Sequence, residues 1–170
     1  NCPDTISVQI TQPNAPLSIS STTTDVFCNG GSDGTISATV SGGTTGYSYS
    51  WDSGQTTEDL SGISAGTYVL TVTDVNGCVE IETAVINEPN AIDLTMNVIN
   101  TCFGKSDGAV SVVVSGGNPS YTYLWNTGQT TQDLNNITSG LYEVTVTDQN
   151  GCTWSISANL SQPALALSNN

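Results

Sequence analysis

The chain has 170 residues, and its 15 Asp and Glu residues face a single basic residue, Lys105, and no histidine, for a formal net charge of −14. Nucleic acids and anionic membrane surfaces require a basic patch, which this composition excludes. No apolar run approaches the roughly 18 residues of a transmembrane helix, so we expect no membrane insertion. The chain starts at Asn1 without a charged and then apolar leader, so we expect a mature or excised fragment.

The composition favours β-strands. Thr, Val and Ile are frequent, and no stretch repeats its apolar residues with the helical period of about 3.6. The five cysteines lie among short segments rich in turn residues, which indicates an oxidising compartment. We therefore predict an all-β protein with an extracellular location.

The chain also repeats itself. Residues 28–78 and 102–152 align without a gap at an offset of 74 positions, and more than half of the paired residues are identical. Cys2, Cys78 and Cys152 are each followed eleven positions later by a proline, which marks the end of a repeat. We predict four parts: the final strand of a truncated preceding repeat, a first repeat, a second repeat, and the start of a following repeat, at residues 1–13, 14–89, 90–163 and 164–170.

Alternating apolar residues predict four strands between the two cysteines of the first repeat, at 34–40, 47–51, 56–60 and 67–73, and the second repeat has the same pattern. Asn76-Gly77 and its counterpart Asn150-Gly151 predict tight hairpins. In the last strand of the first repeat the apolar residues change parity after Ile81, for which a bulge would account. The pattern predicts tandem immunoglobulin-like antiparallel β-sandwich repeats, arranged as beads on a string.

Several aromatic residues have predicted structural roles. Tyr68 and Tyr142 stand at a corner between strands and resemble the tyrosine corner, in which the hydroxyl bonds back to the chain. Trp51 and Trp125 share a strand face with tyrosines and are expected in the core. Trp154 aligns with the acidic Glu80, so this position tolerates exposure. Trp154 therefore either packs at the end of the core or contacts a ligand.

The number of predicted strands between the cysteines suggests which of them form disulfides. Four predicted strands separate Cys28 from Cys78, and an even number of up-and-down strands returns the chain to the end where it began. We predict the disulfides Cys28–Cys78 and Cys102–Cys152, with Cys2 unpaired because its partner lies upstream of the truncation. A further strand, as in a full immunoglobulin layout, would forbid these bonds. Buried free cysteines remain an alternative, and zinc is not expected, since no two cysteines are close and histidine is absent.

Asp33 and Asp107 each follow the first cysteine of a repeat and precede a glycine. Such an oxygen-rich loop could bind calcium, the one cofactor considered. The aspartate could instead cap a turn by accepting hydrogen bonds from nearby backbone, and we favour the turn. No serine has a histidine to activate it, so we expect no catalytic residues and no enzyme activity.

The recurring motifs, taken together, resemble a known family. Cys-x-Gly-x-x-Asp-Gly, Ser-Gly-Gly, Tyr-x-Tyr-x-Trp and Asn-Gly-Cys occur in both copies and resemble the SprB-type repeat of gliding-bacterium cell-surface adhesins. The resemblance covers residues 28–78 and 102–152 in full and residues 1–13 as a remnant. It implies secretion by the type IX route, display on the cell surface, and a part in attachment and gliding motility.

Two functions follow as hypotheses. The first is a structural and adhesive stalk of disulfide-stapled repeats in a large secreted adhesin. Its partners would be neighbouring repeats of the same chain and polysaccharide or abiotic surfaces. The alternative is a carbohydrate-binding accessory module of a secreted polysaccharide-degrading enzyme, with Trp154 as a stacking platform. An exposed aromatic row in both repeats would favour the alternative, and the sequence shows no such row outside the predicted core faces.

Overall fold

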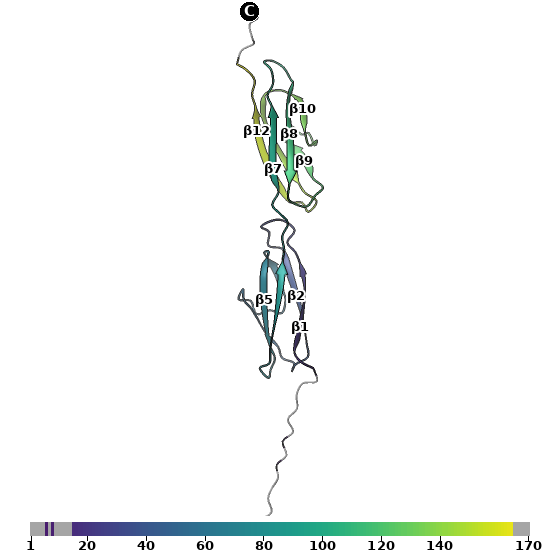
Figure 1. Cartoon of the computed structure of the whole chain (residues 1–170), viewed down its shortest axis with the longest axis vertical. Coiled ribbons are helices and arrows are strands. Elements are labelled where there is room, and N and C mark those ends of the chain that lie inside the picture. Colours follow the sequence, from purple (N-terminus) through teal and green to yellow (C-terminus); the bar gives the residue numbers. More distant parts are fainter. Residues whose placement is uncertain (1–5, 7, 9–14, 165–170) are drawn as a thin grey trace, which may run out of the picture. The chain divides into compact units, whose positions relative to one another are not determined.

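The computed structural model describes residues 6, 8 and 15–164. The predicted end segments 1–13 and 164–170 lie almost entirely outside these residues, as does Cys2. Every regular element in the described part of the chain is a β-strand (Figure 1). Over the same residues, no helix is long and apolar enough to cross a membrane.

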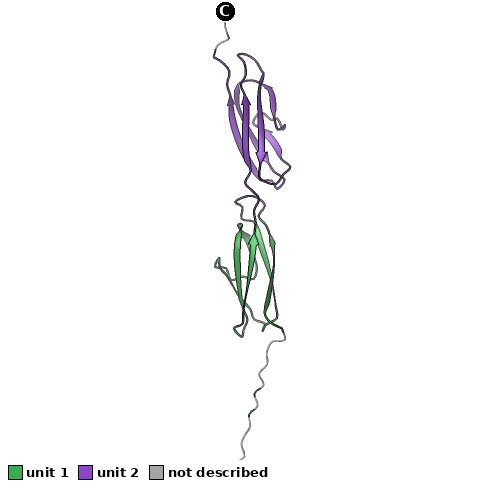
Figure 2. Cartoon of the chain, viewed as in Figure 1, with its two compact units in different colours: residues 1–25, 32–87 green, residues 26–31, 88–170 purple. Residues whose placement is uncertain are grey.

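The chain divides into two compact units, which Figure 2 colours separately. Unit 1 comprises residues 1–25 and 32–87, and unit 2 comprises residues 26–31 and 88–170. The segment 26–31 therefore belongs with unit 2, although both of its neighbours in the sequence belong to unit 1. No sequence pattern predicted that residues 26–31 belong with unit 2. The division into four repeat segments stays a prediction.

Unit 1 consists of two three-stranded antiparallel sheets with the strand orders β1-β2-β4 and β3-β5-β6. Its strands are β1 Ser18–Thr24, β2 Gly34–Ser41, β3 Ser48–Trp51, β4 Leu60–Ile63, β5 Gly66–Thr73 and β6 Val79–Ile86. Unit 2 repeats this topology with the orders β7-β8-β10 and β9-β11-β12. Its strands are β7 Asp93–Ile99, β8 Gly108–Ser115, β9 Thr122–Trp125, β10 Leu134–Ile137, β11 Gly140–Thr147 and β12 Thr153–Leu160.

This strand order is that of an immunoglobulin-like sandwich. The sheets of such a domain contain its strands A, B and E on one side and C, F and G on the other. The six strands of each unit occupy these places in sequence order, which confirms the predicted fold class of antiparallel immunoglobulin-like sandwiches. The strand predicted at 56–60 is wrong, because β4 begins only at Leu60.

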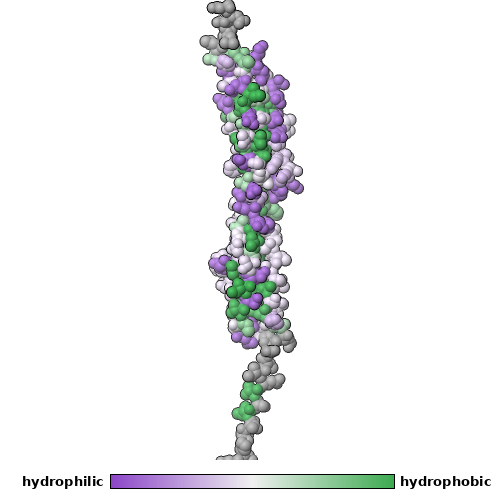
Figure 3. Space-filling view, viewed as in Figure 1, coloured by the Kyte–Doolittle hydropathy of each residue, from purple (hydrophilic) through white to green (hydrophobic). Residues whose placement is uncertain are grey.

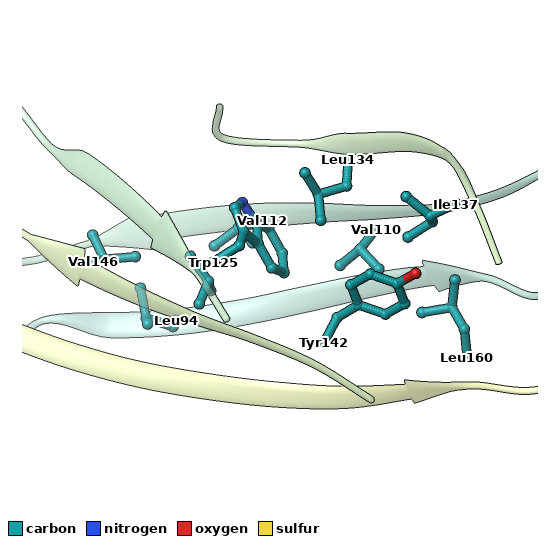
Figure 4. Close-up of a cluster of buried hydrophobic side chains, with 10 residues drawn as sticks. Leu94, Val110, Val112, Trp125, Leu134, Ile137, Tyr142, Val146 and Leu160 are labelled. Carbon is teal, nitrogen blue, oxygen red and sulfur yellow. The ribbon is translucent and has the colours of Figure 1, made fainter. Parts of the chain in front are cut away.

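The core of unit 2 lies between its two sheets (Figure 4). Val110 and Val112 of β8 face Val144 and Val146 of β11, and all four side chains are at most 1% exposed. Their alternation with less buried residues reflects the two-residue period of a strand, and apolar burial is the dominant stabilising term. Trp125 lies among them, and its indole Nε1 donates to the carbonyl of Thr131 at 2.8 Å. Unit 1 has the equivalent core.

Both predicted tyrosine corners are confirmed. The Tyr68 hydroxyl donates to the Ser64 carbonyl at 2.9 Å. The Tyr142 hydroxyl donates to the Thr138 carbonyl at 3.0 Å. Each bond ties the loop before β5 or β11 to its own strand and fixes the corner.

The bulge expected in the last strand of repeat 1 is absent. The pairing of β5 with β6 is continuous from Gly66↔Ile86 to Thr73↔Val79. The change of parity has a simpler cause: Val79 and Ile81 point outward and are more than half exposed, whereas Ala84 and Ile86 are buried. Apolar patches interrupt the polar surface of both units in Figure 3.

The segment between β3 and β4 changes sheets without reversing direction. Its first residue, Asp52, accepts from the amide of Val69 on β5, whereas Asp59 near its end accepts from the amide of Ala38 on β2. The segment 52–59 thus crosses from one sheet to the other where an immunoglobulin domain has a further strand. Asp133 bonds to Val112 in the same way in unit 2.

Candidate functional site

The most distinctive chemical feature of the chain is a disulfide in unit 2. Cys28 bonds to Cys152 with an S–S distance of 1.99 Å and a Cα–Cα distance of 5.6 Å, across 124 positions of sequence. Cys28 lies on the segment 26–31, and Cys152 is the last residue of the hairpin turn between β11 and β12. The bond therefore joins a cysteine of the first sequence repeat to one of the second.

The predicted pairs Cys28–Cys78 and Cys102–Cys152 are wrong. The thiols of Cys78 and Cys102 are free and exposed. The disulfide uses one cysteine from each predicted pair, so neither pair forms. The alternative of buried free cysteines is wrong for these two residues as well.

The strand directions explain the error. The amide of Thr44, just after β2, donates to Oδ2 of Asp74, just after β5, so β2 and β5 end at the same end of unit 1. β3 is antiparallel to β5 and β4 is antiparallel to β2, so β3 and β4 run in the same direction. The chain between Cys28 and Cys78 therefore makes one reversal fewer than predicted, and the two cysteines lie at opposite ends of the strands.

A buried carboxylate shapes the hairpin that carries Cys152. Asp148 is 5% exposed, and its Oδ1 accepts from the amides of Asn150 and Cys152 at 3.0 and 2.8 Å. Its Oδ2 accepts from the amide of Asn118 at 2.9 Å. Burial raises the pKa of Asp148, but these amide hydrogen bonds outweigh burial and hold the pKa below its usual value. Gly151 follows with a φ of 85°, which favours glycine.

The segment 26–31 is held by polar contacts within unit 2. The side-chain amide of Asn29 donates to the carbonyl of Pro89 at 3.1 Å. The amide of Gly30 donates to Oε2 of Glu88 at 2.5 Å. From the hairpin, the side-chain amide of Asn150 donates to the carbonyl of Phe27 at 2.9 Å. These hydrogen bonds hold the segment 26–31 against residues 88–89 and against the hairpin of Cys152, and so place Cys28 next to Cys152.

A hollow adjoins the disulfide, with a volume of about 180 Å³. Its lining is largely apolar and includes Cys28, Pro89, Ile92, Cys152 and Trp154. Trp154 is 58% exposed and lies on β12 opposite Val146. Packing therefore covers less than half of this side chain, and its predicted contact with a ligand stays a prediction.

Asp107, one of the two aspartates considered for calcium, has a capping contact with the chain. Asp107 accepts from the amide of Cys102 at 2.9 Å, which is the turn-capping role favoured for it. This hydrogen bond is the main cause of the lowered pKa of Asp107. No group of three or more His, Cys, Asp and Glu side chains comes together among the described residues. Calcium binding at Asp33 and Asp107 stays an untested expectation.

Sequence reasoning missed the role of the aspartate before each Asn-Gly. Asn76-Gly77 and Asn150-Gly151 predicted the hairpins, but no role was assigned to Asp74 or Asp148. Their recurrence as Thr-Asp-x-Asn-Gly-Cys was the signal that could have identified them, because an Asx-type cap bonds its own backbone two residues further on. The amides of Asn76 and Asn150 donate such bonds to Asp74 and Asp148.

Comparisons with known proteins agree with the motifs. The family model of the SprB repeat matches residues 20–56 and 100–130, one segment in each copy of the repeat. No curated protein matches the chain in sequence. Among solved structures, one titled "Structure of amphioxus IgVJ-C2 molecule" is 13% identical, covers 69% of this chain and 89% of that chain, and has a TM-score of 0.34. The resemblance of both copies to the SprB repeat is thereby confirmed.

Proposed function

We propose that the two units are load-bearing repeats in the stalk of a large secreted cell-surface adhesin, which serves surface attachment and gliding motility. The SprB match supports this proposal, because such repeats occur in secreted cell-surface proteins. The partners would be neighbouring repeats of the same chain and, at the gripping parts, polysaccharide or abiotic surfaces. The acidic composition, with a net charge of −14, would keep such repeats from associating with one another.

The course of the chain through each unit suits a stalk. In unit 1, β1 begins beside the end of β2, at Ser18↔Ser41, and β6 ends beside the start of β5, at Gly66↔Ile86. Because β2 and β5 run in the same direction, the chain enters the unit at one end and leaves it at the other. Unit 2 has the same arrangement, with the pairs Asp93↔Ser115 and Gly140↔Leu160.

This course also determines how tension would act on a unit. The hydrogen bonds between antiparallel strands are perpendicular to the strands. When the disulfide is reduced, tension along the chain pulls β1 lengthwise past β2, with which it pairs from Ser18 to Thr24. The bonds of the pair resist together rather than one after another, as a stalk requires.

The observation that carries the proposal is the Cys28–Cys152 disulfide. A covalent bond between these residues offers tension a direct path from residue 28 to residue 152. Residues 29–151, which include most of both sandwiches, then lie outside the path. A stalk built in this way keeps its length even when a sandwich opens.

Single-molecule force spectroscopy on this chain, held through peptide tags at its two ends, tests the proposal. In the oxidised chain we expect extension only from residues outside the 28–152 loop. Reduction should release the chain across a sequence separation of 124 positions, which adds roughly 430 Å at about 3.5 Å per extended residue.

Two variants make this experiment specific. Cys78→Ser removes a free thiol and should behave as the unchanged chain. Cys28→Ser removes the bond and should give the longer extension under both conditions. An oxidised, unchanged chain that extends to its full length would contradict a load-bearing role for the disulfide.

A carbohydrate-binding role is the second candidate, and the exposure of Trp154 beside the hollow favours it. An exposed indole can stack on a sugar ring. The corresponding position of unit 1 is Glu80, however, so the two units do not share a platform. Saturable binding to a panel of polysaccharides that Trp154→Ala abolishes would establish this role, and absence of binding would leave both units as spacers.

A further inference from the structure

Cys78 and Cys102, the described cysteines outside the disulfide, each occur in a local structure that matches a bonded cysteine. Cys78 corresponds in the repeat to Cys152, and Cys102 corresponds to Cys28. Both thiols are exposed. The local structures around Cys28 and Cys152 therefore show what backbone a bonded cysteine has at each of these two repeat positions.

The segment around Cys102 reproduces that around Cys28. The amide of Lys105 donates to the carbonyl of Cys102 at 3.1 Å, as the amide of Gly31 does to Cys28 at 2.9 Å. Gly104 has a φ of 65° where Gly30 has 73°. The amide of Gly104 donates to Oε1 of Gln162 at 3.3 Å, which repeats the bond from Gly30 to Glu88.

The hairpin that carries Cys78 likewise reproduces that of Cys152. The carboxylate of Asp74 accepts from the amides of Thr44, Asn76 and Cys78, as Asp148 does from the equivalent amides. Gly77 has a φ of 84°. The backbone that presents the bonded sulfur of Cys152 is thus already formed around Cys78.

We propose that Cys78 and Cys102 are half-sites of the same cross-repeat disulfide, and that each takes a cysteine of a neighbouring SprB repeat. Cys102 pairs with the hairpin cysteine of a following repeat, and Cys78 pairs with the cysteine on the 26–31-type segment of a preceding repeat. An array then carries a staggered series of disulfides, in which every repeat is bonded to both neighbours and none is bonded within itself. This inference goes beyond the proposed function and holds whether or not the repeats bear load.

Each such bond forms by thiol–disulfide exchange with a small-molecule or enzyme-bound disulfide as oxidant. One cysteine thiolate attacks that disulfide and releases one thiol. The second cysteine thiolate then displaces the other half from the resulting mixed disulfide. Two thiols of the repeats become one S–S bond, and the two protons and two electrons are found in the two reduced thiols of the oxidant.

The test extends the chain after Pro163 by a second copy of residues 90–163, which adds a following repeat at the natural spacing. The product has seven cysteines, including second copies of Cys102 and Cys152. After refolding in a glutathione redox buffer and alkylation without reduction, intact mass gives the number of free thiols. We expect three, because Cys28 pairs with Cys152 and Cys102 pairs with the added copy of Cys152.

Other thiol counts overturn the proposal. Five free thiols would mean that Cys102 does not use the added hairpin, although the internal bond has formed. One free thiol would mean that each repeat pairs its own two cysteines. Two variants of the extended chain identify the cysteine responsible: Cys102→Ser should leave four free thiols, whereas the matched Cys78→Ser should leave two. The opposite result from the two variants would assign the new bond to Cys78 and contradict the inference.

Discussion

Asp74 and Asp148 show how much one side chain contributes to each unit. Each carboxylate is buried and accepts three backbone hydrogen bonds, which fix the cysteine hairpin against the loop after β2 or β8. Hydrogen bonds to a charged group are stronger than neutral ones, and leaving their donors unsatisfied is costly. The hairpin therefore depends on the carboxylate remaining ionised.

This dependence predicts a pH effect on stability. The folded-state pKa of Asp74 is lowered chiefly by the amide of Thr44, and that of Asp148 also lies below its usual value. A lowered pKa stabilises the fold fully above the unfolded-state pKa of about 4, and this stabilisation is lost as the pH falls through the folded-state pKa. Urea unfolding should therefore give a lower midpoint at pH 3 than at pH 7.

The double variant Asp74→Asn and Asp148→Asn is the matched test of this effect. It keeps the shape of both side chains but cannot ionise, so its midpoint should be lower at pH 7 and should fall less between pH 7 and pH 3. An equal fall in the variant and the unchanged chain would show that other carboxylates cause the acid sensitivity.

At the scale of elements, periodicity predicted the long strands well. The predicted 34–40 and 67–73 correspond to β2 and β5 within one residue at each end, because their alternation follows the buried face directly. The short β4 was misplaced because residues 52–59 are fixed by single side-chain bonds, such as Asp59 to the amide of Ala38, rather than by a ladder. Such bonds leave no periodic pattern in a sequence.

The inward and outward faces of the strands in unit 2 can be compared with a matched pair of Leu→Ala substitutions. Leu134 on β10 is 4% exposed, whereas Leu124 on β9 is 57% exposed. Leu134→Ala should lower the free energy of unfolding by about 2–5 kcal/mol, since it leaves a cavity in the core. Leu124→Ala should change it by no more than about 0.5 kcal/mol. Denaturant unfolding measures both, and similar losses would contradict the assignment of faces.

At the scale of the whole molecule, the sequence contained the repeat, the fold class and the family resemblance but not the cysteine pairing. The parity argument counted strands correctly and still failed, because β3 and β4 run in the same direction. It also considered only bonds within one repeat. The segment 26–31 belongs with unit 2, and only tertiary structure reveals that Cys28 meets Cys152 there.

The central claim, a disulfide between the two sequence repeats, is tested most directly by mapping the bonds of this chain. Cleavage at Asp and Glu without reduction separates all five cysteines onto different peptides. Mass spectrometry should find the Cys28 peptide linked to the Cys152 peptide, with Cys78 and Cys102 alkylated as free thiols. Peptides that link Cys28 to Cys78 and Cys102 to Cys152 would contradict the claim. They would also contradict the proposed disulfides between neighbouring repeats.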